Sequence, residues 1–289
     1  MLRDFELDMP ADLQETLACL PGGRPLAGGT NLLVDLRARR ESAERLVWLG
    51  NIYAFRDIKI EDGQAAIGGG TTVGDILRHP GMERAAPALV DCARVFGGQM
   101  VRNQATLAGN VCSGSPAADS VPPLLSLDAE LCLANATQVR TIALDDFYTV
   151  FKKNRRSPDE LVTGISWPVP GPNTANRFYK LARRKGDAIT VVGVAVTVTR
   201  DGNTCTDARI ALGAVAPTVF RAKEAEALII GETLTEERVD EAAQKAKELS
   251  DPIDDLRASA DYRRDMVQVL TRRLLNQAWQ SLGEKEAGR

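Results

Sequence analysis

The segment that most restricts the fold of this chain is a run of small and hydrogen-bonding residues, TLAGNVCSGSPAADS, from Thr106 to Ser120. It is too long and too polar for a mere turn, and it interrupts a region in which regular elements otherwise alternate. We interpret it as the binding segment for a large polar ligand. Two structural roles stay open beside this one, because Asp119 could cap a helix that begins near Pro122 and Asn110 could hold a turn.

A second glycine-containing loop lies nearer the N-terminus, where the sequence LAGGTNLL runs from Leu26 to Leu33. The pattern predicts a strand that ends at Gly28 and Gly29 and is followed by a helix. Glycines allow a ligand to approach the backbone closely, Thr30 and Asn31 add side-chain donors, and a helix start adds partial positive charge, so the turn suits the pyrophosphate of a dinucleotide. A Gly-Gly turn capped by Thr or Asn is also common in purely structural roles.

A third glycine-rich segment, Gly68 to Gly74, has a spacing that does not match the nucleotide-binding glycine fingerprint. We interpret it as a turn that leads into a helix capped by Thr72. Basic residues cluster at three places, which we interpret as solvated faces: Arg37–Arg40, Lys152–Arg156 and Arg183–Lys185. Lys180 stands apart from these clusters because it precedes Leu181 in a strand-like segment.

The composition argues against several classes of function. The 289 residues include 36 Lys and Arg against 39 Asp and Glu, so no excess positive charge is present to bind nucleic acid or an anionic membrane. No apolar run approaches the roughly 20 residues that cross a bilayer, and the N-terminus does not resemble a secretion signal, so we expect a cytoplasmic protein. The five cysteines lack the spacing of a metal site, and the single histidine, His79, stands before Pro80 at the expected end of a helix. If the chain is an enzyme component, its chemistry would therefore belong to a bound cofactor, and we expect no metal site on this chain.

Turn residues and hydrophobic periodicity predict several folded units. The expected division is a first α/β subdomain at 1–55, a second at 56–170, a C-terminal domain at 171–283 and a disordered tail at 284–289. We expect hairpins at the Asp62-Gly63 turn and between 191–199 and 204–212. Pro10-Ala11-Asp12 predicts a helix start near the N-terminus, and later helices are expected at about 220–230, 236–249 and 259–281.

Four segments, in this order, resemble the FAD-binding (medium) subunits of molybdenum hydroxylases of the xanthine dehydrogenase and carbon monoxide dehydrogenase type. They are AGGTNLL at 27–33, TLAGNVCSGSPAADSVP at 106–122, ARIALGAVAPTVFRAKEAEALIIG at 208–231 and DYRRDMVQVLTRR at 261–273. The resemblance extends over nearly the whole chain. It implies an α+β fold, in which an FAD-binding domain of the vanillyl-alcohol-oxidase (PCMH) type, built from two α/β subdomains, precedes a C-terminal domain with a small antiparallel sheet and helices.

The sequence departs from the family pattern at two places. Ala108 replaces the first glycine of the usual GGN, which adds one methyl group beside the cofactor, and we expect this to be tolerated because Gly109 remains. The cysteine-bearing insertion of the related hydroxybenzoyl-CoA reductase subunits is missing. The resemblance therefore implies no additional iron–sulfur cluster in this chain.

The resemblance also implies which residues bind FAD. The first loop would hold the pyrophosphate with Leu26, Ala27, Gly28, Gly29, Thr30, Asn31 and Leu32. The second loop would line the ribityl chain and the flavin with Thr106, Gly109, Asn110, Ser113, Ser115 and Asp119. Phe96 and Ala105 match positions beside the cofactor, and Leu161 and Val162 would pack on the isoalloxazine ring. Lys180 would approach the edge of the ring, where its charge would favour the anionic reduced flavin.

The family further implies an oxidoreductase assembled from three kinds of subunit, as a heterotrimer or its dimer. A large molybdopterin-binding subunit would oxidise the substrate, a small [2Fe-2S] subunit would relay electrons, and the FAD of this chain would pass them to an acceptor such as NAD+. Quinone, ferredoxin and oxygen stay open as acceptors, and the substrate is not encoded in this chain. Two alternatives also stay open: a free-standing flavin-dependent oxidoreductase of the same superfamily, and an assembly subunit that has lost its cofactor.

Overall fold

The N-terminal part of the chain forms a three-stranded parallel sheet with strand order β1-β3-β2. The structure is a computed structural model that describes residues 4–287. The first elements are β1 (Glu6–Asp8), α1 (Leu13–Cys19), β2 (Arg24–Leu26), α2 (Leu32–Arg37), β3 (Arg45–Trp48) and the 3-10 turn η1 (Tyr53–Arg56). Helix α1 begins where the sequence predicts, because the Asp12 carboxylate accepts a hydrogen bond from the Glu15 backbone at 2.8 Å. Strand β2 then leads into the Gly28-Gly29 loop and α2, in the predicted order.

The second part is built on a five-stranded antiparallel sheet with order β4-β5-β10-β6-β7. Its elements are β4 (Ile58–Glu61), β5 (Gln64–Gly68), α3 (Val73–Arg78), α4 (Met82–Ala85), α5 (Pro87–Val95), α6 (Gln99–Gln104), α7 (Leu107–Cys112), α8 (Val121–Ser126), β6 (Glu130–Ala134), β7 (Val139–Ala143), the 3-10 turn η2 (Leu144–Asp146), β8 (Tyr148–Val150), β9 (Lys153–Asn154) and β10 (Leu161–Pro168). The β4–β5 hairpin turns at Asp62-Gly63, as predicted. Thr72 caps α3 as predicted, and the Asp75 carboxylate accepts a hydrogen bond from the Thr72 backbone at 2.9 Å.

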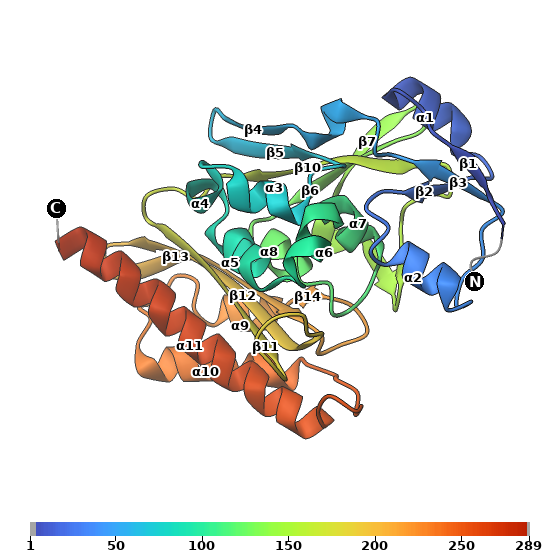
Figure 1. The fold of residues 1–289 in the computed structure, drawn as a ribbon. Coiled ribbons are helices and arrows are strands. Elements are labelled where there is room, and N and C mark those ends of the chain that lie inside the picture. Colours follow the sequence, from blue (N-terminus) through green and yellow to red (C-terminus); the bar gives the residue numbers. More distant parts are fainter. Residues whose placement is uncertain (1–3, 288–289) are drawn as a thin grey trace.

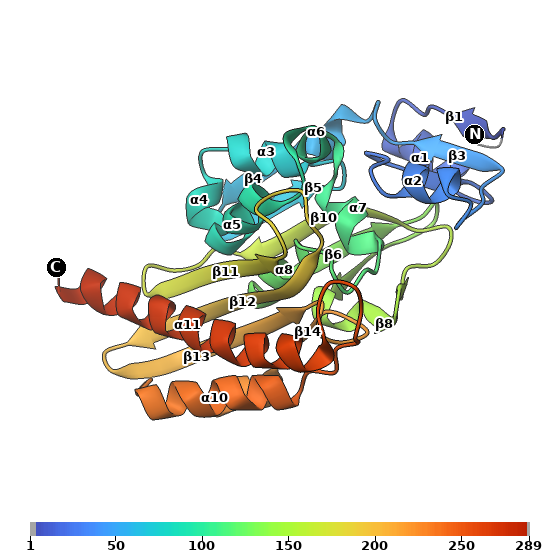
Figure 2. The ribbon, with the colours of Figure 1, turned by 60° about the horizontal axis from the view of Figure 1, so that its bottom comes forward.

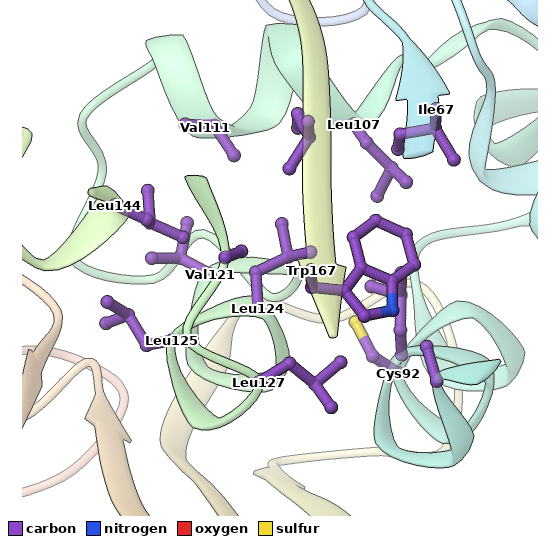
Figure 3. Packing of buried hydrophobic residues seen from close by; sticks show 14 of the residues in the cluster. Ile67, Cys92, Leu107, Val111, Val121, Leu124, Leu125, Leu127, Leu144 and Trp167 are labelled. Carbon is purple, nitrogen blue, oxygen red and sulfur yellow. The ribbon is translucent and has the colours of Figure 1, made fainter. Parts of the chain in front are cut away.

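Helices α3 to α8 lie against this sheet and enclose a core around Trp167 of β10 (Figure 1). Figure 3 shows the Trp167 ring among Leu107, Leu124 and Leu127, which come from α7, α8 and the chain just after α8. The indole N–H donates to the backbone carbonyl of Ala85 at 2.9 Å, so the polar atom of this buried ring is satisfied. The helices that carry the second loop are therefore fixed by a dry core.

The C-terminal part is a four-stranded antiparallel sheet with order β11-β12-β13-β14. Its elements are β11 (Thr174–Ala182), β12 (Thr190–Asp201), β13 (Thr204–Gly213), β14 (Phe220–Arg221), α9 (Lys223–Ala227), α10 (Glu236–Glu248) and α11 (Ala260–Ala287). Helices α10 and α11 run along one face of the sheet (Figure 2), and the other face packs on α5 and α8. Because both faces are covered, β12 is buried at nearly every position, as a two-sided strand requires.

Two expectations for this part need correction. The helix expected at 220–230 is shorter, because Phe220–Arg221 pairs as an edge strand and only Lys223–Ala227 is helical. The disordered tail expected after Gly283 is wrong for residues 284–287, which continue α11 to Ala287; residues 288–289 lie outside the described chain. The expected β12–β13 hairpin and the expected helix at 236–249 are present.

A buried polar network centred on Asn176 of β11 joins the C-terminal sheet to the preceding helices. The Asn176 side chain is 2% exposed. Its oxygen accepts from the Ala88 backbone at 2.9 Å, and its amide donates to Ser126 at 3.0 Å and Thr197 at 2.8 Å. Because these partners belong to α5, α8 and β12, the network fixes the β11 strand that carries Lys180 against the helices. Across residues 4–287, no helix combines the length and apolar character needed to span a membrane.

Candidate functional site

One large cavity, about 820 Å³ in volume, brings the two predicted loops together. Its lining residues come from the segment after β2, from α6 and α7 and from the start of β10, so residues far apart in the sequence share its wall. Figure 1 shows the course of these elements in the chain. All eighteen residues implied by the resemblance line it: Leu26, Ala27, Gly28, Gly29, Thr30, Asn31, Leu32, Phe96, Ala105, Thr106, Gly109, Asn110, Ser113, Ser115, Asp119, Leu161, Val162 and Lys180. Its volume falls in the upper part of the roughly 300–1,000 Å³ range of sites for small organic ligands.

The first loop needs glycine at two adjacent positions for different reasons. A Cβ atom on Gly28 would stand 1.7 Å from the backbone oxygen of Gln104, because the loop packs directly on the end of α6. Gly29 has a φ of +69°, in the left-handed region that favours glycine. Within the described chain, the backbone N–H groups from Gly28 to Leu32 donate to no protein acceptor. They are therefore available to an acidic or polar ligand in the cavity.

The second loop is held in place by its own hydrogen bonds. Thr106 caps α7, with its hydroxyl accepting from the Gly109 backbone at 3.0 Å. The Asn110 side-chain oxygen accepts from the Ser120 hydroxyl at 2.7 Å and from the Ser120 backbone at 3.2 Å. Asn110 therefore does hold a turn, the structural role that the sequence left open, and its amide N–H₂ still has no acceptor among the described residues.

Asp119 does not cap the following helix. Ser120 occupies the N-cap position of α8 without a side-chain capping bond, whereas the Asp119 carboxylate faces Lys180 of β11 at 2.6 Å. Both side chains are buried, with exposed fractions of 10% for Asp119 and 5% for Lys180. Thr190, at the start of β12, donates its hydroxyl to the second carboxylate oxygen. Burial raises the pKa of the Asp119 carboxyl above its ordinary value, and the bonds from Lys180 and Thr190 offset this only in part.

The apolar wall of the cavity comes from the start of β10 and from the segment before α6. Leu161 and Val162 are 6% and 3% exposed, and β10 has a bulge directly after Val162. Glu160 precedes them and forms an ion pair with Arg140 at 2.6 Å; this hydrogen-bonded guanidinium lowers the pKa of the Glu160 carboxyl. The pair fixes the start of the strand, so the two apolar side chains are presented from a rigid position.

Some residues at the site were not identified from the sequence. Thr190 lies outside every quoted motif, and its role depends on the packing of β12 against the second loop. The interpretation of Lys152–Arg156 as a solvated face is incomplete, because Lys152, Lys153, Asn154 and Arg156 line the cavity. The sequence of a lysine pair in a short hairpin does not show whether the pair faces solvent or lines a cavity.

Two family models cover this chain. The FAD binding domain in molybdopterin dehydrogenase matches residues 4–170, and the CO dehydrogenase flavoprotein C-terminal domain matches residues 177–278. The chain belongs to the family of FAD-binding subunits of molybdenum hydroxylases. It is an oxidoreductase component whose cofactor is FAD, and the expected fold class is confirmed.

Individual relatives extend over almost the full length of the chain. The carbon monoxide dehydrogenase medium chain of Hydrogenophaga pseudoflava is 31% identical, with 95% of this chain and 97% of that protein covered. The putative xanthine dehydrogenase FAD-binding subunit of Escherichia coli K12 is 30% identical, with 95% of both covered. Among solved structures, carbon monoxide dehydrogenase from H. pseudoflava matches with a TM-score of 0.94 at 31% identity, covering 97% of this chain and 99% of that chain. Quinoline 2-oxidoreductase from Pseudomonas putida 86 gives 0.91 at 28% identity, covering 98% and 99%.

The residues around the cavity fit FAD. The wall combines free backbone N–H groups at the first loop, small polar side chains at the second loop and an apolar face at Leu161 and Val162. The N–H groups suit a diphosphate, the small polar side chains suit a polyhydroxyl chain, and the apolar face suits a flat aromatic ring. A side chain on Gly28 would collide with the Gln104 backbone, so the close packing of the first loop on the end of α6 requires glycine there. Ala108 lies in α7 and is 6% exposed, which places its methyl group within the packed helix at the cavity wall.

Proposed function

We propose that this chain is the electron-transfer subunit of a heterotrimeric molybdenum hydroxylase or its dimer. Its partners would be a large molybdopterin-binding subunit and a small [2Fe-2S] subunit. The relatives support this because they are the medium or FAD-binding chains of such enzymes, so a free-standing flavoenzyme is not favoured. FAD, when bound, supplies the redox chemistry, receiving electrons from the iron–sulfur partner and delivering them to an external acceptor such as NAD+.

Each wall of the cavity has a separate task in this proposal. The N–H groups from Gly28 to Leu32 bind the diphosphate, and Thr106, Asn110, Ser113 and Ser115 orient the ribityl chain and the ring. Leu161 and Val162 cover one face of the ring and exclude water from it. Lys180 stands at the ring edge, held by Asp119. The observation that carries the proposal is that one cavity gathers these residues from segments that are remote in the sequence.

We also propose domain boundaries near residues 55 and 170. Each of the three larger sheets stays within one of the intervals 1–55, 56–170 and 171–283, and no strand pairing among the described residues joins two of them. The cytoplasmic location expected from the sequence stays a prediction.

The flavin content of two matched variants tests the proposal. Gly29→Asp places a carboxylate where the diphosphate would lie, and we expect the FAD bound per chain to fall by about tenfold or more, because like charges repel strongly in a partly dry site. Gly63→Asp is the control, since Gly63 has a similar φ of +74°, has open space around it and lies in the β4–β5 turn. The absorbance spectrum of each purified protein, before and after addition of FAD, gives the content. Equal content in both variants, or a wild-type protein that takes up no flavin, would contradict the proposal.

Assembly and acceptor are tested on the complex. Co-expression of this chain with candidate partner subunits should give a complex with molybdopterin and iron–sulfur absorbance. Reduction of that complex by its substrate should reduce NAD+ if NAD+ is the acceptor. Reduction of the flavin in the lone chain by a small organic substrate would instead support the free-standing alternative.

A further inference from the structure

The β8–β9 hairpin carries a group of positive charges that no part of the proposed site uses. Lys152, Lys153 and Arg156 line the cavity together with Asn154. The hairpin is short, with only Phe151 and Lys152 between its two strands. It therefore brings several basic side chains to one wall of the ligand cavity.

Hydrogen bonds fix the hairpin on the second loop. The Tyr148 hydroxyl donates to the Val111 carbonyl at 2.9 Å, and the Asn154 amide donates to the Cys112 carbonyl at 3.3 Å. The Lys152 backbone donates to the Gly114 carbonyl at 3.2 Å.

The backbones of Lys152 and Gly114 also pack closely on each other. A Cβ atom on Gly114 would lie 2.9 Å from the Lys152 Cα atom, and Gly114 has a left-handed φ of +60°. Lys152 itself has a φ of +56°, an uncommon conformation for a residue with a side chain. The surrounding bonds must hold this conformation, so the lysine backbone has a defined place beside Ser113 and Ser115.

The charges on this wall are not neutralised by the protein. Of the other cations that line the cavity, Arg24 pairs with Glu41 and Lys180 pairs with Asp119. Over residues 4–287, neither Lys152 nor Lys153 has a carboxylate within ion-pair distance. The Arg156 guanidinium donates to two backbone carbonyls, those of Ser157 at 3.1 Å and Glu160 at 2.6 Å. Positive charge therefore accumulates at one place of the cavity. Of the lining carboxylates, those of Asp35, Glu41 and Asp119 are paired with other cations, and among the described residues only that of Asp187 has no ion pair.

We propose that the β8–β9 hairpin, together with Arg156 just after it, binds the diphosphate of a nucleotide. This inference rests on the proposed flavin function and adds a second phosphate-binding element to the first loop. The diphosphate is the strongly charged part of a dinucleotide, and two ammonium groups complement its two negative charges. Lys152 and Lys153 contact the phosphate oxygens, and Arg156 adds charge while it holds the following segment. The diphosphate of FAD is the first source, and that of a dinucleotide acceptor has the same chemistry.

Flavins with and without phosphate separate this role from general flavin binding. We expect the Lys152→Gln/Lys153→Gln double variant to raise the Kd for FAD by about tenfold or more, as loss of charge-assisted hydrogen bonds does, and to leave the Kd for riboflavin unchanged. The control is Lys59→Gln/Arg84→Gln, which removes the same charge from exposed residues that do not line the cavity. Fluorescence quenching of each flavin on titration with apoprotein measures both constants.

The outcomes distinguish the two sources of diphosphate. If the Kd for FAD is unchanged but ADP-ribose binds the FAD-loaded variant more weakly than the wild type, the hairpin binds the diphosphate of an acceptor. If neither ligand is affected, or if riboflavin is weakened as much as FAD, the inference is wrong. A wild-type protein that binds no flavin would overturn the proposed function itself. Should the double variant not fold, Lys153→Gln alone decides, because this exposed side chain can be exchanged singly and its loss must still weaken FAD binding and not riboflavin binding.

Discussion

The buried ion pair between Asp119 and Lys180 gives the sharpest prediction for this protein. Lys180→Met keeps most of the volume of the side chain but removes the positive charge. The Asp119 carboxylate, which is 10% exposed and whose pKa is already raised by burial, then stays buried without a charge partner. We therefore expect a large loss of stability from a substitution that changes almost no volume.

The size of the loss follows from the burial of the pair. Removing one partner of a buried ion pair costs about 3–5 kcal/mol, because the remaining charge is desolvated without compensation. The pair lies on the wall of a cavity rather than in a dry core, so we expect the lower end, about 3 kcal/mol for the apoprotein. Asp119→Asn should cost less, because it leaves the Lys180 ammonium alone but removes a carboxylate whose raised pKa means that burial disfavours its ionised form. The double variant leaves neither charge unpaired, and its loss should be smaller than the sum of the single losses by about 2 kcal/mol.

Urea unfolding of the FAD-free protein, followed by circular dichroism and by tryptophan fluorescence, measures these free energies. The two probes should give coincident transitions for each variant, which justifies a single free energy of unfolding. Arg94→Met is the control, because its ion pairs with Glu83 and Asp91 are exposed and should contribute less than about 1 kcal/mol. A loss of that small size for Lys180→Met, with additive effects in the double variant, would refute the argument from burial.

Three further predictions concern other parts of the chain. Asn176→Leu should lower the free energy of unfolding, measured by denaturant titration, by about 3 kcal/mol or more. The Ala88 N–H and the Ser126 hydroxyl would lose their hydrogen bonds to Asn176 while they stay buried. A loss below about 1 kcal/mol would contradict this. Glu160→Gln should cost stability at neutral pH but much less in acid. The pKa of Glu160 is lowered in the fold, so its ionised form stabilises the fold above about pH 4.5, and this contribution disappears as the pH falls through the folded-state pKa. A difference in unfolding free energy between the wild type and Glu160→Gln that does not change with pH would argue against this. Burial raises the pKa of Cys112 to about 11, so alkylation at about pH 8, read by peptide mass spectrometry, should be far slower in the folded than in the unfolded chain.

Local signals in the sequence were sufficient for much of the fold. The Asp12 and Thr72 caps, the Asp62-Gly63 turn and the β12–β13 hairpin are short-range features, and each forms where its residues predict. Elements at sheet edges and chain ends were harder to predict from the sequence. The helix expected at 220–230 loses its first residues to β14, because pairing with the exposed edge of β13 competes with helix propensity there. The sequence predicts that the last helix ends near residue 281, yet α11 continues through Gly283 to Ala287, because a single glycine weakens a helix without ending it.

The candidate site was predicted by motif and not by geometry. The sequence order of the two loops does not say that they face one cavity; that depends on the packing of the Gly28 loop on Gln104 at the end of α6. Polar contacts between residues far apart in the sequence could not be predicted either. Asp119, a residue with helix-capping chemistry, is drawn to Lys180 because β11 brings an ammonium group within 2.6 Å across the domain contact. Thr190 joins this pair through the start of β12, and no local pattern marks a threonine for such a role.

The pairing of Lys180 changes what its charge can do to the cofactor. The sequence suggested a positive charge that favours the anionic reduced flavin, yet Asp119 carries an opposite charge at hydrogen-bond distance, so the fields of the two groups largely cancel at the ring. With Lys180 at the flavin edge, as we propose, the two single variants should act in opposite directions. Asp119→Asn leaves the positive charge alone and should raise the midpoint potential of the bound flavin, and Lys180→Met leaves the negative charge alone and should lower it. For a two-electron couple, each 30 mV of shift corresponds to about 1.4 kcal/mol of differential stabilisation. Spectroscopic titration of the FAD-loaded variants measures the potentials, and two shifts of the same sign, or none, would show that the pair does not stand beside the ring.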